Sequence, residues 1–209
     1  MDISELLLGI EKTDEEDKIS YSAGVIMALS LKDIGFEEVN YADFTEGVKS
    51  VFQNSYPKIS QKKAIDIFNN YVTLLREEIK VKNKEEGQKF LEENARRKEV
   101  VSLPSGLQYE ILIDGTGKIP AIHDTVTIIY EGALLNNRIF DSTKDDGPRQ
   151  FKLMDMIPGW QEALLRMPSG SRWKIFIPPH LAYGEAGAPP VVQPNSTLQF
   201  TVELIKTEE

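Results

Sequence analysis

The residues of this sequence that could do chemistry are aromatic and apolar side chains close to predicted turns, together with one carboxylate. Each of them, taken singly, is more typical of a core than of a site. If they converge at one end of a sheet, however, they form an apolar pocket with a few polar groups, which is the usual composition of a ligand-binding site. The set consists of Tyr130, Phe140, Phe151, Met156, Ile157, Trp160, Tyr183, Val191, Val192 and Phe200, with Asp141 as the acid.

Other kinds of active site have little support in the sequence. The chain has no cysteine, which excludes disulfides, thiol catalysis and thiolate metal sites. Its histidines, His123 and His180, both stand beside loop residues, so we expect no histidine metal site. The segment "DGTGK" lacks the full phosphate-loop spacing and opens no helix, and no Ser–His–acid set is evident. We therefore expect neither a metal nor a cofactor.

Charge and hydropathy limit the partners of the chain. The net charge is −9 with no basic patch, so neither nucleic acid nor an anionic membrane surface is an expected partner. No apolar run reaches the ~20 residues that span a bilayer.

The N-terminal segment has no basic region or small-residue cleavage site, which predicts a cytoplasmic protein if the chain is complete. A mature form given a new starting Met would look the same and would be periplasmic, so both compartments stay open. No role is assigned to the first 17 residues.

The candidate residues require a sheet and one helix to position them. Apolar and polar residues alternate in the second half of the chain, which predicts strands. A single helix signal, "IPGWQEALLRM", interrupts them, and Pro158 suits its first turn. Strands with one helix indicate an α+β domain in which an antiparallel half-barrel sheet wraps the helix, with Leu164 and Met167 in the core and Trp160 pointing out of one end. The predicted strands lie within residues 107–113, 125–132, 171–178 and 197–206.

The first hundred residues predict helices. Apolar residues recur at helical spacing in residues 19–34, and Gly35 is a natural helix end. Asn40 and Ser60 can cap two further helices. No proline interrupts the third helix before Leu103, so we expect it to run roughly 40 residues. Its segment 80–89 is polar almost all round, which is typical of a solvent-exposed stalk.

The apolar faces of these helices need a partner, because helical stability comes mostly from burying such a face. An intramolecular three-helix bundle is one solution. We favour a helical dimerisation domain that the stalk joins to the sheet domain. The sequence thus predicts two domains, a helical one with its stalk over residues 1–100 and a catalytic or binding one over residues 101–209.

Several segments resemble the successive signatures of the FKBP-type peptidyl-prolyl cis–trans isomerases. They are "VTIIYEGALLNNRIFDST", "FKLMDMIPGWQEALLRMPSGSRWKIFIPPHLAYG" and "PNSTLQFTVELI". The N-terminal segments "ISYSAGVIMALSLKDIG" and "FLEENARRKEVVSLPSGLQYEIL" extend the similarity to the macrophage infectivity potentiator (Mip)-like branch, whose members have a helical dimerisation arm. The resemblance covers nearly everything after residue 17.

This resemblance implies a homodimeric enzyme that rotates X-Pro peptide bonds, assists protein folding and binds macrolide inhibitors such as rapamycin, without a metal or cofactor. Trp160 would be the floor of the proline pocket, Tyr183 would offer its hydroxyl to a substrate carbonyl, and Asp141, beside the catalytic Tyr130, would lie near the twisting amide. The walls would be Tyr130, Phe140, Phe151, Met156, Ile157 and Phe200, with Val191 and Val192 as the cap.

Departures from the family pattern keep a second function open. The loop "STKDDGPRQ", residues 142–150, is one residue short and has Asp146 where a basic residue is common, so cationic support for Asp141 would have to come from Arg149. Met156 makes a softer wall than the usual valine, and Pro190 makes a stiffer rim. The alternative to the isomerase is a folding chaperone or peptide-binding scaffold with weak or no turnover.

Overall fold

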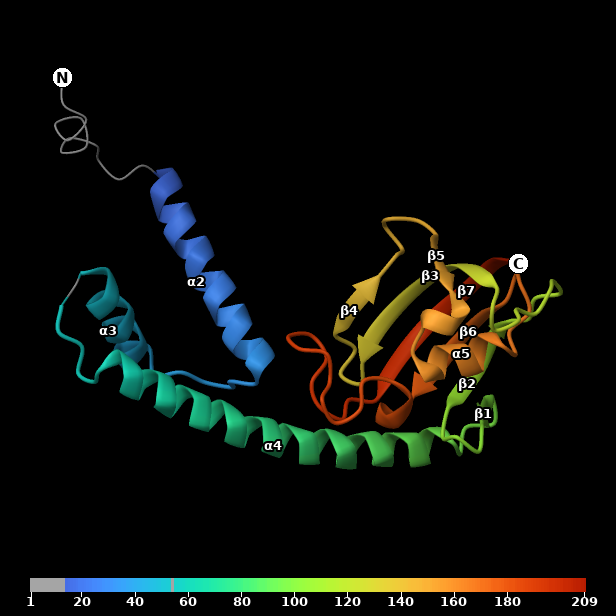
Figure 1. Ribbon diagram of the computed structural model, residues 1–209, viewed down its shortest axis with the longest axis horizontal. Coiled ribbons are helices and arrows are strands. Elements are labelled where there is room, and N and C mark those ends of the chain that lie inside the picture. Colours follow the sequence, from blue (N-terminus) through green and yellow to red (C-terminus); the bar gives the residue numbers. More distant parts are fainter. Residues whose placement is uncertain (1–13, 54) are drawn as a thin grey trace, which may run out of the picture. The chain divides into compact units, whose positions relative to one another are not determined.

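The protein divides into two compact units in the computed structural model, which describes residues 14–53 and 55–209. One unit ends at Val72 and the other runs from Thr73 to Glu209. The first contains helices α2 (Asp14–Ile34) and α3 (Tyr41–Phe52) and the beginning of α4 (Gln61–Asn94) (Figure 1). The second contains the rest of α4, the sheet and one further helix.

Local capping explains where these helices begin and end. Gly35 adopts a φ of 111°, and the N–H groups of Gly35 and Phe36 both donate to the carbonyl oxygen of Leu31. Asn40 Oδ1 accepts hydrogen bonds from two N–H groups in the first turn of α3. Ser60 Oγ accepts one from the first turn of α4 at 3.3 Å. The predicted end of α2 and the two predicted caps are confirmed.

The helical unit buries little of its apolar surface within itself. Phe36 stacks on Phe68 with ring centroids 5.8 Å apart and meets Tyr71 edge to face. Within residues 17–53 and 55–72, however, no residue is fully buried. An intramolecular bundle core is therefore not formed in this part of the chain. The exposed large side chains on α2 are Ile19, Tyr21, Val25, Ile26, Met27 and Leu29.

Helix α4 departs from its prediction in two ways. It ends at Asn94 after 34 residues, short of Leu103. The polar segment 80–89 is also not a fully solvated stalk, because Gly87 is buried against Thr197. A polar helix face can pack through hydrogen bonds and close backbone approach, neither of which produces an apolar stripe in the sequence.

The second unit is built on a sheet in which every pairing is antiparallel. In the part of the chain that the structure describes it has seven strands, in the order β1-β2-β6-β7-β3-β4, with β5 also paired to β3. Strands β1, β4 and β5 have only three or four residues each and were not predicted, since alternation cannot be recognised over so short a run. The strands are β1 (Val100–Ser102), β2 (Gln108–Ile113), β3 (Thr125–Leu134), β4 (Ile139–Ser142), β5 (Arg149–Lys152), β6 (Arg172–Ile177) and β7 (Leu198–Glu208).

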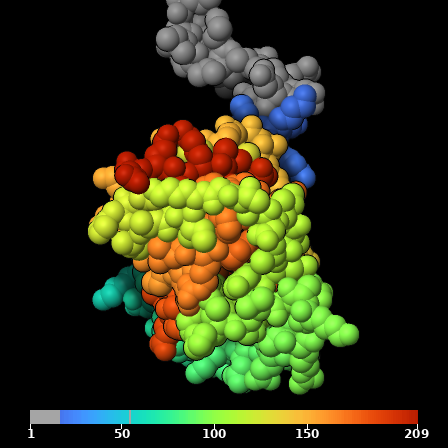
Figure 2. Space-filling view, turned by 90° about the vertical axis from the view of Figure 1, so that its right-hand side faces the viewer, coloured from blue at the N-terminus to red at the C-terminus, as the bar shows by residue number. Residues whose placement is uncertain are grey.

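Helix α5 (Pro158–Leu164) lies against one face of this sheet and completes the core (Figure 1). Leu164 and Met167 are buried there as predicted. In β2, where apolar and polar residues alternate, Ile111 and Ile113 are exposed. Figure 2 shows the segment before β3 lying against the C-terminal end of β7, where Lys118 contacts Glu209 at 2.9 Å. Two short 3-10 helices, η1 (Leu153–Asp155) and η2 (Pro179–Leu181), complete the unit.

Candidate active site

A cavity of about 450 Å³ opens beside the N-terminal end of α5. Trp160 and most of the other predicted pocket residues line it. Two of the predicted residues, Val191 and Val192, do not. The lining residues are Tyr130, Phe140, Asp141, Gln150, Phe151, Lys152, Asp155, Met156, Ile157, Trp160, Tyr183 and Phe200.

Trp160 is held in place by local sequence and by neighbouring rings. Pro158 occupies the first turn of α5, where its missing N–H costs no hydrogen bond. A Cβ on Gly159 would overlap the side chain of Ile177, so glycine allows α5 to lie close on β6. The indole meets Tyr130 edge to face at 5.3 Å and Phe200 at 5.0 Å between ring centroids. It is only 4% exposed, and that small surface is part of the cavity lining.

The aromatic walls form a continuous cluster. Phe140 and Phe200 meet edge to face at 5.5 Å, and Tyr130 meets Phe151 at 6.2 Å. Gly132 on β3 lies beneath the two phenylalanines, because a Cβ there would be 2.5 Å from Cε1 of Phe200 and 3.0 Å from Cζ of Phe140. The wall geometry therefore depends on a glycine that was not identified from the sequence.

One short hydrogen bond defines the polar side of the cavity. The hydroxyl of Tyr130 donates to Oδ2 of Asp141 at 2.6 Å. Burial raises the pKa of Tyr130 well above its ordinary value, and the hydrogen bond to Asp141 raises it further. The hydroxyl thus stays protonated and remains a donor throughout the neutral range. Arg149, the expected support for Asp141, forms an ion pair with Asp146 at 2.6 Å.

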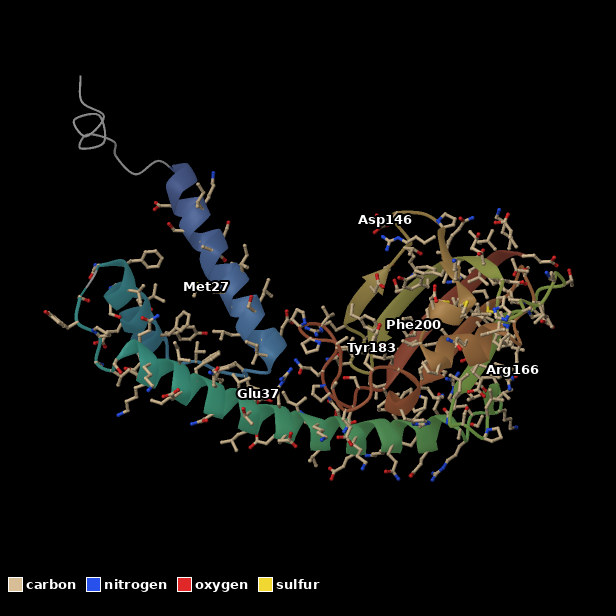
Figure 3. The ribbon with its side chains drawn as sticks, viewed as in Figure 1. Met27, Glu37, Asp146, Arg166, Tyr183 and Phe200 are labelled. Atoms are coloured by element: carbon tan, nitrogen blue, oxygen red, sulfur yellow. The ribbon has the colours of Figure 1, made fainter. Side chains whose placement is uncertain are left out.

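Tyr183 reaches the cavity from the loop that follows η2. Its side chain is 41% exposed, and Figure 3 shows it near Phe200, whereas Asp146 lies in the turn between β4 and β5. Within residues 14–53 and 55–209 the Tyr183 hydroxyl forms no hydrogen bond, and the residue lines the cavity. The hydroxyl is accessible to a ligand in the pocket.

The two valines expected to cap the pocket are not part of its lining. Val192 is buried in the hydrophobic core cluster, and its backbone forms a bridge with Ala188. Val191 is partly exposed, and its carbonyl oxygen accepts a hydrogen bond from Nη2 of Arg138 at 2.9 Å. The capping role of both valines was implied by the family resemblance. Val192 shares its core cluster with Trp160 and Phe200, and neither valine is part of the cavity lining.

Three polar residues of the lining were missed by the sequence analysis. Gln150 and Lys152 flank Phe151 on β5, and Asp155 directly precedes Met156. They could have been found from the sequence, because they stand next to residues predicted to form the pocket walls. They add amide, ammonium and carboxylate groups to a lining that already contains Asp141.

Neither a metal-binding cluster nor a membrane-spanning helix is present within residues 14–53 and 55–209. No group of three His, Cys, Asp or Glu side chains in this range is arranged to hold a metal ion. No helix in the same range is both long and apolar enough to cross a membrane.

Comparisons with known proteins agree with this geometry. Residues 117–205 match the model of the FKBP-type peptidyl-prolyl cis-trans isomerase family, and residues 16–111 match the domain amino-terminal to FKBP-type peptidyl-prolyl isomerase. The chain is 36% identical to peptidyl-prolyl cis-trans isomerase Mip of Coxiella burnetii, over 93% of this chain and 88% of that protein. It is 35% identical to outer membrane protein MIP of Legionella longbeachae, over 94% and 88% of the two chains. The crystal structure of FkpA from Escherichia coli superposes with a TM-score of 0.67 at 31% identity, covering 95% of this chain and 99% of that one.

Proposed function

The chain belongs to the family of FKBP-type peptidyl-prolyl cis–trans isomerases, and we propose that it rotates X-Pro peptide bonds in the aromatic pocket beside α5. The enzyme class follows from its relatives. The assignment of the reaction to this pocket, with individual roles for its residues, is the proposal.

The composition of the pocket suits a reaction that needs no nucleophile. Rotation about an X-Pro bond must break amide resonance, and unaided it takes ~10–100 s. Resonance places negative charge on the carbonyl oxygen, which water stabilises. An apolar pocket removes that water, and the twisted transition state, with less charge separation, suffers less from its loss. Groups complementary to the twisted amide then lower the barrier by differential binding.

Six of the lining residues have distinct parts in this scheme. The prolyl ring lies on Trp160, between the walls formed by Phe140 and Phe200. Tyr183 donates its hydroxyl to a carbonyl oxygen of the substrate. Asp141, fixed by the 2.6 Å hydrogen bond from Tyr130, is the polar group beside the rotating amide.

The observation that carries the proposal is the cavity that joins Trp160, Asp141 and Tyr183. A protease-coupled assay on a short X-Pro peptide tests it. We expect turnover well above the uncatalysed rate for the wild type and clear losses for Asp141→Ala and Tyr183→Phe. Rates that neither variant changes would contradict the assigned roles. Background turnover in the wild type would favour the alternative, a chaperone or scaffold that only binds chains.

We further propose that the chain works as a homodimer through its N-terminal helices. The match to an FKBP amino-terminal domain and the exposed apolar side chains of α2 support this. In this proposal residues 1–100 form the dimerisation domain with its stalk, and residues 101–209 form the isomerase domain. Analytical ultracentrifugation at micromolar concentration should give twice the chain mass. A monomer under these conditions would contradict the dimer.

We also propose that the pocket binds macrolide inhibitors. Macrolide inhibitors such as rapamycin should compete with prolyl peptides for the pocket, and inhibition that leaves peptide KM unchanged would contradict a shared site.

Of the two compartments compatible with the sequence, we propose the one outside the cytoplasm. The name of the Legionella longbeachae relative, outer membrane protein MIP, supports it. Cell fractionation tests this, and recovery with the cytoplasmic proteins would contradict it.

A further inference from the structure

The loop that carries Tyr183 closes on itself at its base. Residues 182–197, here called the rim loop, lead from η2 to β7. The N–H of Asn195 donates to the carbonyl oxygen of Gly184 at 2.9 Å, so the two ends of the loop meet directly beside Tyr183. Whatever fixes this base also fixes the position from which the Tyr183 side chain enters the cavity.

Helix α4 contacts this base through hydrogen bonds. Nδ2 of Asn83 donates to the carbonyl oxygen of Pro194 at 2.8 Å and lies 3.5 Å from Oγ of Ser196. Nδ2 of Asn195 donates in turn to the carbonyl oxygen of Lys80 at 3.2 Å. Pro194 is buried, so its carbonyl oxygen depends on a protein donor, and Asn83 is that donor.

An ion pair adds little to this connection. Nζ of Lys80 lies 2.7 Å from Glu185, but the Glu185 side chain is largely exposed. Exposed pairs of this kind are weakened by solvent and salt. The half-buried amide of Asn83 therefore matters more than the charge of Lys80.

The rest of the same helix face packs on β6 and on the residue before β7 within the second unit. Asn83, Gly87 and Phe90 follow one another at spacings of four and three residues and so share one face. Gly87 leaves no room for a side chain beside Thr197, and the ring of Phe90 lies 5.6 Å from that of Phe176. Because α4 is fixed at these points, the amide of Asn83 is a fixed attachment point for the rim loop.

We propose that Asn83 is a positioning residue for the isomerisation, acting through the Pro194 carbonyl and the base of the rim loop to hold Tyr183 over the pocket. This inference rests on the proposed function of that pocket. Asn83 is not in the cavity lining and acts only through the loop. A displacement of about 1 Å in a catalytic group can cost on the order of 10²-fold in rate.

The test compares Asn83→Leu, which removes the donor while keeping a similar volume, with Lys82→Leu, a matched control at an exposed neighbouring position. For Asn83→Leu we expect kcat on a short X-Pro peptide to fall about 10-fold, with KM within about 2-fold because floor and walls are intact. The control should retain wild-type values. Asn83→Asp, which keeps the shape and an oxygen but lacks the donor, should behave as Asn83→Leu does.

Two readouts separate positioning from general destabilisation. In a Tyr183→Phe background, Asn83→Leu should cause little further loss, because both changes remove the same contribution. Amide hydrogen exchange at Asn195 should become faster in Asn83→Leu and stay unchanged in Lys82→Leu, whether or not the wild type shows turnover. Full additivity with Tyr183→Phe, or unchanged kcat and exchange in Asn83→Leu, would overturn the proposal. Wild-type turnover in the same assay tests the proposed function independently.

Discussion

Replacing Gly132 with alanine tests how closely the aromatic walls of the pocket are packed. The new methyl carbon would lie 2.5 Å from Cε1 and 2.8 Å from Cδ1 of Phe200. Carbon atoms in favourable contact are about 3.5–4.0 Å apart, so the overlap is about 1 Å. The ring of Phe200 has to move, and the indole of Trp160, 5.0 Å away between ring centroids, limits where it can go.

Two effects of known size follow from this overlap. Overpacking of a core costs about 1–3 kcal/mol in the free energy of unfolding. Movement of Phe200 by about 1 Å also narrows the pocket, and a misplacement of that size lowers kcat/KM by about 10- to 100-fold. Because the change removes room for the substrate, the loss should include a higher KM.

Chemical denaturation and steady-state kinetics on a short X-Pro peptide measure the two effects. Gly47→Ala is a suitable control, because no atom lies within 4 Å of the added carbon and the site is inside α3. There alanine should be neutral or stabilise by up to about 1 kcal/mol. If Gly132→Ala keeps both the wild-type denaturation midpoint and the wild-type KM, the close packing of Phe200 on β3 is refuted.

Three further changes probe individual interactions. Tyr130→Phe removes the hydrogen bond to Asp141 and should cost about 1 kcal/mol at pH 7. Folding raises the pKa of Tyr130, so this contribution is fully present below the unfolded value of about 10 and is lost progressively as the pH rises from there through the raised folded value. The difference between the two proteins in urea unfolding should therefore shrink above about pH 10, and a difference that stays constant there would contradict this. Asp124→Asn should lower the stability of the folded protein at pH 7, because the hydrogen bond from the N–H of Ala121 lowers the pKa of Asp124 in the folded state. The difference in Tm between wild type and variant should shrink below about pH 4, where the carboxylate becomes protonated. A difference in Tm that does not change with pH would refute this role of the carboxylate. Asn40→Ala should cost α3 about 1 kcal/mol, measured by its amide hydrogen exchange, and unchanged exchange would show that the cap is unimportant.

The parts of the fold that are determined locally could be predicted from the sequence. Asn40 and Ser60 cap helices because their side-chain oxygens accept hydrogen bonds from nearby N–H groups, which requires no tertiary information. The longer strands were evident from alternation. The contact of α4 with the rim loop could not be predicted from such patterns. Asn83 contacts the loop through a hydrogen bond, and Gly87 packs closely because it has no side chain.

The candidate site divides in the same way. Trp160 and its aromatic neighbours could be selected because their residue types lie close to predicted turns, and their resemblance to a known family strengthened the selection. Whether Val191 and Val192 line the pocket could not be judged from their residue types, since their orientation depends on the path of a long loop with distant contacts such as the one between Val191 and Arg138. Gly132 could not be identified from the sequence. It matters because the rings of Phe140 and Phe200, which belong to other strands, pack where a side chain would lie.

The most direct test of prolyl binding on Trp160 uses the indole itself. The chain has two tryptophans, and Trp173 is buried against Tyr109, with ring centroids 4.4 Å apart, away from the cavity lining. In a Trp173→Phe variant the tryptophan emission therefore comes from Trp160 alone. Titration with a short X-Pro peptide should change this emission saturably, whereas the matching X-Ala peptide should leave it unchanged. If the variant isomerises the X-Pro peptide while the emission does not respond, or responds equally to both peptides, the prolyl ring does not lie on Trp160.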